Sequence, residues 1–354
     1  MKTRLLLMAG AAGLLCSAAT AAQAAQGRSA AAPPAAASAA ASAPSAINPA
    51  LMAANPRPPG PPTTLKPGKR VNRIIEMWLK GQPVYYATSS GGGYEDGKRM
   101  AATKADYIAY DMEHAPLDFR QLHDFMRGLK DAGPTRTGHV TPAVIVTLPI
   151  AGTPDAVRAN TWMIQQALAQ GIHGLLLCNA ESAEAARLMV EAARYPFDPA
   201  VPGLGIGTRG NGSQGQASPL WGMTSDEYFK SADVWPINPN GEILLGVKIE
   251  NPRADAAMSS IFNVPGISFA EWGPGDHGFN VMGPPGSGSN NDPRMVAIRA
   301  NVLAETKAKG LKFLNACNEE TVIDQLKDGT MICTGGDSPA ADKGRAFTKR
   351  TDPW

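Results

Sequence analysis

The sequence lacks the marks of several common protein classes. It has four cysteines in 354 residues, and none of them forms the closely spaced pairs of a structural zinc site. So few cysteines also exclude a disulfide-dense scaffold. Its 33 basic and 31 acidic residues give a formal net charge of +2, and no basic cluster indicates nucleic-acid binding. We therefore expect a small-molecule partner and no nucleic acid.

The first residues predict export. Met1-Lys2-Thr3-Arg4 precedes an apolar stretch at 5–15 and a small-residue stretch at Ala22-Gln23-Ala24-Ala25. This order describes a secretory signal peptide over residues 1–25. Because the apolar stretch is shorter than the roughly 18 residues that a membrane span needs, stable membrane insertion is not expected. The prediction is a periplasmic or secreted protein.

The next segment, residues 26–69, consists almost entirely of Ala, Pro, Ser and Gly and is predicted to be a disordered linker. Residues 70–354 are enough for one large domain or two small ones. A bond between Cys317 and Cys333 is compatible with an oxidising compartment. Cys178 ends an apolar run, which favours a buried thiol over a nucleophile.

Strand-like and helix-like segments alternate from Val71 onward. Apolar and β-branched runs predict eight strands, at residues 83–88, 105–110, 143–148, 173–178, 243–247, 267–270, 311–315 and 331–334. Eight strand–helix repeats favour a (β/α)8 TIM barrel over an open doubly wound sheet. The open sheet would need a phosphate-binding loop, and Gly91-Gly92-Gly93 lacks that pattern.

Acidic residues follow three of the predicted strands. Glu250 and Asp276 follow the fifth and sixth strands, and Asp111, Glu113 and His114 follow the second. Because the carboxyl ends of barrel strands open on one rim, these side chains are expected to lie close together. The oxygen donors of Glu250 and Asp276 suit a divalent cation such as Mg²⁺ or Mn²⁺. His114 suits proton transfer, since an imidazole titrates near neutrality.

Several motifs resemble those of one protein family. Asp111-Met112-Glu113-His114-Ala115-Pro116-Leu117-Asp118 resembles the Asp-x-Glu-His-Ala-Pro-x-Asp signature of the metal-dependent class II pyruvate aldolases, in the HpcH/HpaI aldolase and citrate lyase β-subunit superfamily. Ile249-Glu250 and Gly273-Pro274-Gly275-Asp276 resemble its two metal-ligand motifs. Arg194-Tyr195-Pro196 resembles a landmark before its active-site loop. The resemblance extends from about Val71 to Asp337.

The resemblance implies a (β/α)8 barrel of the phosphoenolpyruvate/pyruvate-domain type, usually in a homo-oligomer. It implies a divalent cation (Mg²⁺, Mn²⁺ or Co²⁺) held by Glu250 and Asp276. This cation stabilises the enolate that forms when a carbon–carbon bond of a 2-oxo acid breaks.

The same resemblance assigns roles to other residues. His114, with Asp111, would manage protons, and backbone N–H groups near Gly273 and Pro274 would help to hold the substrate carboxylate. Part of residues 197–242, a long stretch rich in Gly, Pro, Asn and Ser, would cover the site. Trp272 is expected to line the pocket or to pack in the barrel.

Two positions depart from the family pattern. Leu148 stands where the family has an arginine that steadies the keto oxygen of the substrate. Lys248 stands where the family has a glutamine, two residues before the metal-binding glutamate. It either supplies the missing positive charge or weakens metal binding by repulsion. Arg209, in the glycine-rich stretch, is another candidate replacement, and standard pyruvate aldolase activity is open to question.

The sequence thus predicts an exported, metal-dependent carbon–carbon lyase of the aldolase type. Its substrate would be a 2-oxo or hydroxy acid, or a related compound, and the reaction would pass through an enolate. The alternative is a degenerate, aldolase-like periplasmic binding protein without turnover. Leu148 favours the alternative. Intact Asp111, His114, Glu250 and Asp276 favour the enzyme, because a binding protein has little need of an acid/base pair.

Overall fold

The computed structural model describes residues 69–284 and 290–352. The predicted signal peptide and all but the last residue of the predicted linker lie outside these ranges. None of the helices within them combines the length and apolar character that a membrane span requires.

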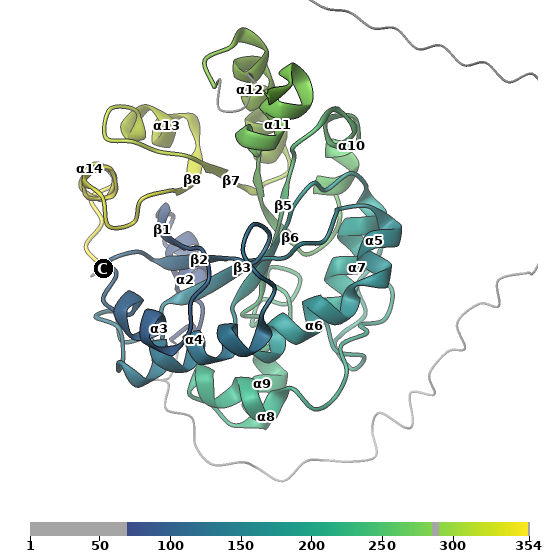
Figure 1. The fold of residues 1–354 in the computed structure, drawn as a ribbon, viewed down its shortest axis with the longest axis vertical. Helices are drawn as coiled ribbons and strands as arrows, with labels where there is room; N and C mark the ends of the chain where they lie inside the picture. Colours follow the sequence, from purple (N-terminus) through teal and green to yellow (C-terminus); the bar gives the residue numbers. More distant parts are fainter. Residues whose placement is uncertain (1–68, 285–289, 353–354) are drawn as a thin grey trace, which may run out of the picture. The chain divides into compact units, whose positions relative to one another are not determined.

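The strands form a closed parallel barrel in sequence order, with β8 paired to β1, and helices surround it (Figure 1). The strands are β1 (Val84–Ser89), β2 (Tyr107–Asp111), β3 (Ala143–Thr147), β4 (Gly174–Leu177), β5 (Leu244–Lys248), β6 (Ile267–Glu271), β7 (Lys312–Asn315) and β8 (Thr330–Cys333). All eight lie at the predicted strand segments to within a few residues. The predicted (β/α)8 barrel is confirmed.

Helices precede, connect and follow the strands. They are α2 (Arg73–Leu79), α3 (Tyr94–Met100), α4 (Phe119–Asp131), α5 (Pro154–Ala159), α6 (Thr161–Ala169), α7 (Ala183–Ala193), α10 (Pro252–Phe262), α11 (Pro274–Met282), α12 (Pro293–Ala308), α13 (Val322–Asp328) and α14 (Pro339–Phe347). One apolar core lies between the strands and these helices, and a second fills the inside of the barrel. Both follow from the alternation of side chains along each strand.

Helix α2 precedes β1 and contributes to the core inside the barrel. Asn72 caps it, because its side chain accepts a hydrogen bond from the Ile74 amide (3.0 Å). Ile74 and Trp78 join the inner cluster together with Val84 of β1. The helix therefore closes the amino-terminal end of the barrel and leaves the carboxyl-terminal rim as the open end.

The long stretch at 196–242 is not at that rim. It contains α8 (Gln214–Ala217), a 3-10 helix at Ser218–Trp221 and α9 (Ser225–Ser231). Trp235 lies against Trp78 of α2, with ring centroids 6.0 Å apart. The segment joins the end of a helix to the start of a strand, and such connections lie at the amino-terminal end of a barrel. The expectation that it covers the site is wrong.

A buried carboxylate joins the first and last parts of the barrel. Asp106, which precedes β2, accepts hydrogen bonds from Arg73 Nε (3.0 Å), the Tyr85 amide (3.0 Å) and Arg350 Nη1 (2.9 Å). Burial raises the pKa of Asp106, but Arg350 and Arg73 outweigh it and hold the pKa below its usual value. Helix α14 packs on Tyr85 of β1 in the same chain, so this network ties the end of the chain to its first strand.

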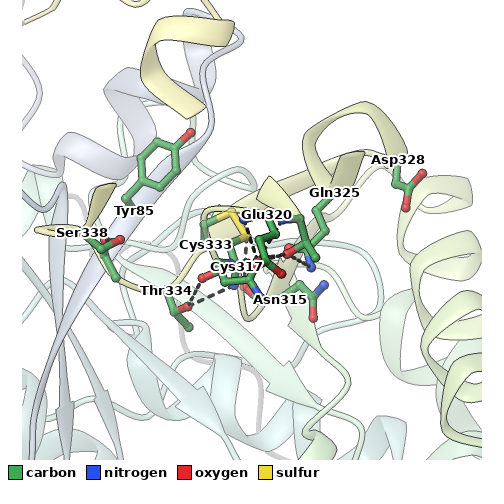
Figure 2. The surroundings of a disulfide bond; sticks show 12 residues. Tyr85, Asn315, Cys317, Glu320, Gln325, Asp328, Cys333, Thr334 and Ser338 are labelled. Carbon is green, nitrogen blue, oxygen red and sulfur yellow. Dashed lines mark hydrogen bonds between the residues drawn. A yellow bond between two sulfur atoms is a disulfide. The ribbon is translucent and has the colours of Figure 1, made fainter. Parts of the chain in front are cut away.

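Cys317 and Cys333 form a disulfide (Figure 2). Cys333 ends β8, and Cys317 lies in the loop after β7, so the bond joins two neighbouring strands at the rim. The Cys317 amide also donates to Thr334 Oγ1 (3.1 Å). Cys178 is a free, buried thiol, as predicted.

Removing this disulfide should lower the free energy of unfolding by about 3 kcal/mol, because a cross-link over a loop of this length restricts the unfolded chain. Urea unfolding of oxidised protein, reduced protein and the double variant Cys317→Ser/Cys333→Ser measures the loss. Reductant should bring the unchanged protein to the stability of the double variant, and should leave the variant itself unaffected. Equal stability of the oxidised and reduced forms would contradict the prediction.

Candidate active site

Inward-facing side chains at the carboxyl ends of the strands surround a cavity of about 140 Å³. Its lining residues are Tyr86, Thr88, Tyr107, Ala109, Asp111, Glu113, His114, Ile145, Thr147, Leu176, Lys248, Phe269, Glu271 and Leu314. Neighbouring strands place their last residues side by side. Asp111 is in register with Thr147, and Lys248 with Glu271.

Asp111 and His114 form a hydrogen-bonded pair at the mouth of this cavity. Asp111 Oδ1 accepts from Thr147 Oγ1 (2.8 Å) and from the amides of Glu113 (2.8 Å) and His114 (3.2 Å). Asp111 Oδ2 lies 3.0 Å from His114 Nδ1. Burial raises the pKa of Asp111, but these hydrogen bonds outweigh it and keep the pKa below its usual value. Asp111 is therefore a fixed anion.

That anion sets the state of His114. The hydrogen bond to Asp111 raises the pKa of the imidazole above its ordinary value. With Nδ1 donating to Asp111, Nε2 is left as the nitrogen that can exchange a proton with a bound molecule. The side chain is 65% exposed, so the ring is accessible from solvent. The geometry is that of an acid/base residue oriented by a carboxylate.

Lys248 is the one lysine or arginine among the residues that line the cavity. Its Nζ lies 3.3 Å from Glu250 Oε1 and 3.7 Å from Glu113 Oε2. Burial lowers the pKa of Lys248, but Glu271, Glu250 and Glu113 outweigh it and raise the pKa above its ordinary value. The side chain is therefore an ammonium ion. It can stabilise negative charge on a bound molecule, whereas a nucleophilic lysine would have to be neutral.

Glu250 follows β5 and is almost fully buried. Its Oε2 accepts from the Asn179 amide (2.7 Å). Burial raises the pKa of Glu250 to about 7, although Lys248 lowers it. The charged form of Glu250 thus depends on a neighbouring cation.

Gly273 makes room for this carboxylate. It has a φ of +48°, and a Cβ added to it would lie 2.2 Å from Glu250 Cγ. A larger residue would therefore clash with Glu250, besides adopting an unfavourable left-handed conformation. Pro274 begins α11 directly after Gly273. Neither residue lines the cavity, so their predicted contact with a substrate carboxylate stays a prediction.

Asp276 lies in the first turn of α11, partly buried. Asn280 Nδ2 donates both to the Glu250 carbonyl (3.2 Å) and to the Asp276 carbonyl (2.9 Å), which ties α11 to the end of β5. In the described part of the chain, two groups of three side chains are close enough to share a metal ion. They are Asp111, Glu113 and His114, and Glu113, Cys178 and Glu250. Asp276 belongs to neither, so its role as a ligand stays a prediction.

Similarity to known proteins shows which family the chain belongs to. No family model matches the chain. A hydroxypyruvate/pyruvate aldolase of Delftia acidovorans is 31% identical over 216 residues, which are 60% of this chain and 67% of that protein. A second such aldolase, of Roseovarius nubinhibens, is 28% identical over 232 residues, 66% of this chain and 74% of its own. A 2-keto-3-deoxy-L-rhamnonate aldolase of Klebsiella pneumoniae is 27% identical over 254 residues, 70% of this chain and 78% of its own.

A solved structure has the same fold. It is an HpcH/HpaI aldolase/citrate lyase family protein from Burkholderia cenocepacia, with a TM-score of 0.57 and 23% identity, and the match covers 73% of this chain and 91% of that one. The chain belongs to the HpcH/HpaI aldolase and citrate lyase family. The resemblance inferred from the motifs is confirmed.

Within this family member, the structure does not place Leu148 or Trp272 at the cavity. Leu148 follows β3 and is buried in the core between strands and helices, next to Ile164. Thr147 is the residue that faces the cavity there. Trp272 is also buried, and its Nε1 donates to Asn315 Oδ1 (2.9 Å). Of the two roles expected for Trp272, the structure supports packing.

Arg209 is a structural residue. Its guanidinium lies over the rings of Tyr195 (4.7 Å) and Tyr228 (5.4 Å), and Nη2 donates to the Tyr228 hydroxyl (2.6 Å). The side chain is 1% exposed and belongs to the segment at the amino-terminal end of the barrel. Arg209 is therefore not a replacement for the missing arginine of this HpcH/HpaI family member.

Sequence reasoning missed Glu271 and the tyrosines of the cavity. Glu271 is the last residue of β6 and faces inward, whereas the predicted strand ended at residue 270. Extending the alternation by one residue from Phe269 would have found it, because residues i and i+2 share a face. Tyr86 and Tyr107 also alternate inward, but the sequence carries no signal that separates a cavity residue from a core residue.

Replacing Asp111 with asparagine should lower the pKa of His114 toward the ordinary histidine value, because it removes the anion that favours the imidazolium. NMR titration of the His114 ring protons measures the shift, with a His114→Gln variant to assign the signals. Thr147→Val removes only a hydrogen bond donated to Asp111 and keeps the anion, so the pKa of His114 should stay raised in this variant. An unchanged His114 pKa in Asp111→Asn would show that the pair does not form.

Proposed function

We propose that the chain is a divalent-metal-dependent carbon–carbon lyase of the aldolase type. It would cleave a 4-hydroxy-2-oxo acid into an oxo acid and an aldehyde, or join the two in the reverse reaction, through an enolate. Relatives named for aldolase reactions on oxo acids support this reaction class. The observation that carries the proposal is the Asp111–His114 pair, which shares one cavity with the Lys248 ammonium ion.

The charge of the site supports a metal cofactor. Asp111, Glu113, Glu250 and Glu271 surround or adjoin the cavity, and Lys248 is the one strongly basic side chain among them. An oxo-acid anion would be repelled by this excess of carboxylates. A bound divalent cation reverses the local charge.

The donors also fit such an ion. Carboxylate oxygens are the ligands that Mg²⁺ and Mn²⁺ prefer. Glu113 Oε2 is buried and accepts no hydrogen bond from the described residues. We assign Glu250, Asp276 and Glu113 as the residues that would hold the ion. When bound, it would polarise the keto group of the substrate as a Lewis acid.

The side chains of the protein would then perform the remaining steps. His114 Nε2 takes the proton of the 4-hydroxyl as the bond between C3 and C4 breaks. The bonding electrons pass into the enolate and an aldehyde leaves. Lys248 stabilises the negative charge on the enolate oxygen, and His114 returns its proton to C3 to complete the oxo acid. Lys248 thus supplies the positive charge that Leu148 does not.

The alternative of a binding protein without turnover gains no support from this arrangement. Ligand binding alone does not need an exposed histidine whose Nδ1 is fixed by a carboxylate. The aldolase names of the relatives also favour turnover.

Glu250→Gln should lower kcat/KM by about 100-fold or more, because it removes a charged ligand at the site where enolate charge develops. The assay is aldehyde and oxo-acid release from a panel of 4-hydroxy-2-oxo acids with Mg²⁺, Mn²⁺ or Co²⁺, and chelator should abolish it. Glu242→Gln is the matched control. Glu242 is buried with a pKa raised to about 7 by burial, but it bonds Asn72 at the other end of the barrel. Metal binding without release from any substrate would contradict the aldolase assignment.

We further propose that the protein is exported to the periplasm or beyond. The N-terminal pattern and the Cys317–Cys333 disulfide support this, since disulfides persist in oxidising compartments. Cell fractionation should find the oxidised protein outside the cytoplasm, and deletion of residues 1–25 should retain it inside with free thiols. Cytoplasmic retention of the full chain would refute export. Assembly into a homo-oligomer stays a prediction.

A further inference from the structure

The floor of the cavity is aromatic. Tyr86 and Tyr107 are in register on β1 and β2, and their ring centroids lie 5.1 Å apart at an interplanar angle of 31°. Phe269 of β6 lines the same cavity. Its volume of about 140 Å³ is close to that of engineered apolar cavities of about 150 Å³ that bind benzene. One aromatic ring would therefore fill the cavity, and the oxo acid would lie at its mouth, where Asp111 and His114 are and where Glu250 and Asp276, which do not line the cavity, would hold the ion.

Glu271 borders this floor. It lies two residues after Phe269 on the same face of β6 and lines the cavity. Its carboxylate makes no side-chain hydrogen bond to the described residues; its register partner Lys248 attracts it electrostatically but forms its ion pairs with Glu250 and Glu113. Glu271 is thus a polar group that faces the cavity and is available to a bound molecule.

The surroundings disfavour a second anion next to Glu271. Burial raises the pKa of Glu271 above its ordinary value, and the same loss of solvation would act on any carboxylate placed beside it. Asp111 and Glu113 add negative charge at the mouth of the cavity. A carboxylated end group would meet this charge without a free lysine or arginine among the lining residues to pair with it.

We propose that the aldehyde subsite takes an uncharged aromatic aldehyde with a ring hydroxyl, and that Glu271 is the residue that determines this specificity. The inference rests on the proposed aldolase function and names the class of its aldehyde. The ring packs on Tyr86 and Tyr107, and its hydroxyl donates a hydrogen bond to Glu271. Aldehydes with a carboxylate in the same position are excluded.

Two aldehydes that differ only in the para group test the proposal. With pyruvate and Mg²⁺ or Mn²⁺, at a pH low enough to keep the phenol protonated, the full protein should use 4-hydroxybenzaldehyde with a kcat/KM at least about tenfold above that for 4-carboxybenzaldehyde, as repulsion between nearby like charges requires. Glu271→Gln should bring this ratio toward one. Asp155→Asn neutralises a carboxylate whose side chain is 99% exposed on α5, and it should keep the ratio unchanged.

A variant of Tyr86 tests the packing of the substrate ring on the aromatic floor. Tyr86→Leu should lower kcat/KM for 4-hydroxybenzaldehyde relative to acetaldehyde, because stacking on the ring is lost. Tyr86→Phe, which keeps the ring, should retain most of the preference. Circular dichroism of each variant verifies the fold.

Exchange of the C3 protons of pyruvate with deuterium separates the two proposals, because it reports enolate formation without an aldehyde. Exchange with the expected preference supports the inference. Exchange with equal use of both aldehydes, or with preference for the carboxylated one, overturns it and leaves the aldolase function in place. Absence of metal-dependent exchange overturns the proposed function and the inference together.

Discussion

The site depends on one buried ammonium ion in a ring of carboxylates. Lys248 lies among Glu113, Glu250 and Glu271, which raise its pKa despite its burial. The opposite charges stabilise one another in the buried site. Without Lys248, the buried Glu250 would face other carboxylates and favour its neutral form. The same group keeps a full positive charge available to an enolate oxygen. The interaction that allows these charges inside the barrel is thus the interaction that a reaction through an enolate would use.

The register of the barrel strands brings these side chains together. Because parallel strands are paired in order, the last inward residues of β2 and β3, and of β5 and β6, lie side by side. The disulfide between Cys317 and Cys333 links the next two strands, β7 and β8. Asn315, two residues before Cys317, accepts from Trp272 Nε1, next to Gly273, which packs directly against Glu250. The disulfide-linked strands therefore also contact the segment that holds Glu250.

Most of the fold could be predicted because its signals are local. Runs such as residues 143–147 identify a strand by themselves, and carboxylates directly after strands identify the rim. The wrong predictions concern the direction in which a side chain points and the end of the barrel at which a connecting segment lies. Leu148 and Thr147 are adjacent, yet the pleat sends one to the helices and the other to the cavity. Residues 196–242 were expected over the site because loops often cover sites, but they follow a helix and so lie at the opposite end of the barrel.

Arg209 and Glu271 show why charge alone does not locate function. Arg209 is buried between two tyrosine rings, where delocalised charge and planar stacking offset the loss of solvation. Glu271 lies outside the family motifs, two residues before Gly273; its charge interacts with Lys248, and it borders an open cavity. Arg209 is enclosed by side chains and has no open space beside it, although its Nε and Nη1 have no hydrogen-bond partner among the described residues. Glu271 borders an open cavity that a ligand can enter, which is why Glu271 carries the specificity argument and Arg209 does not.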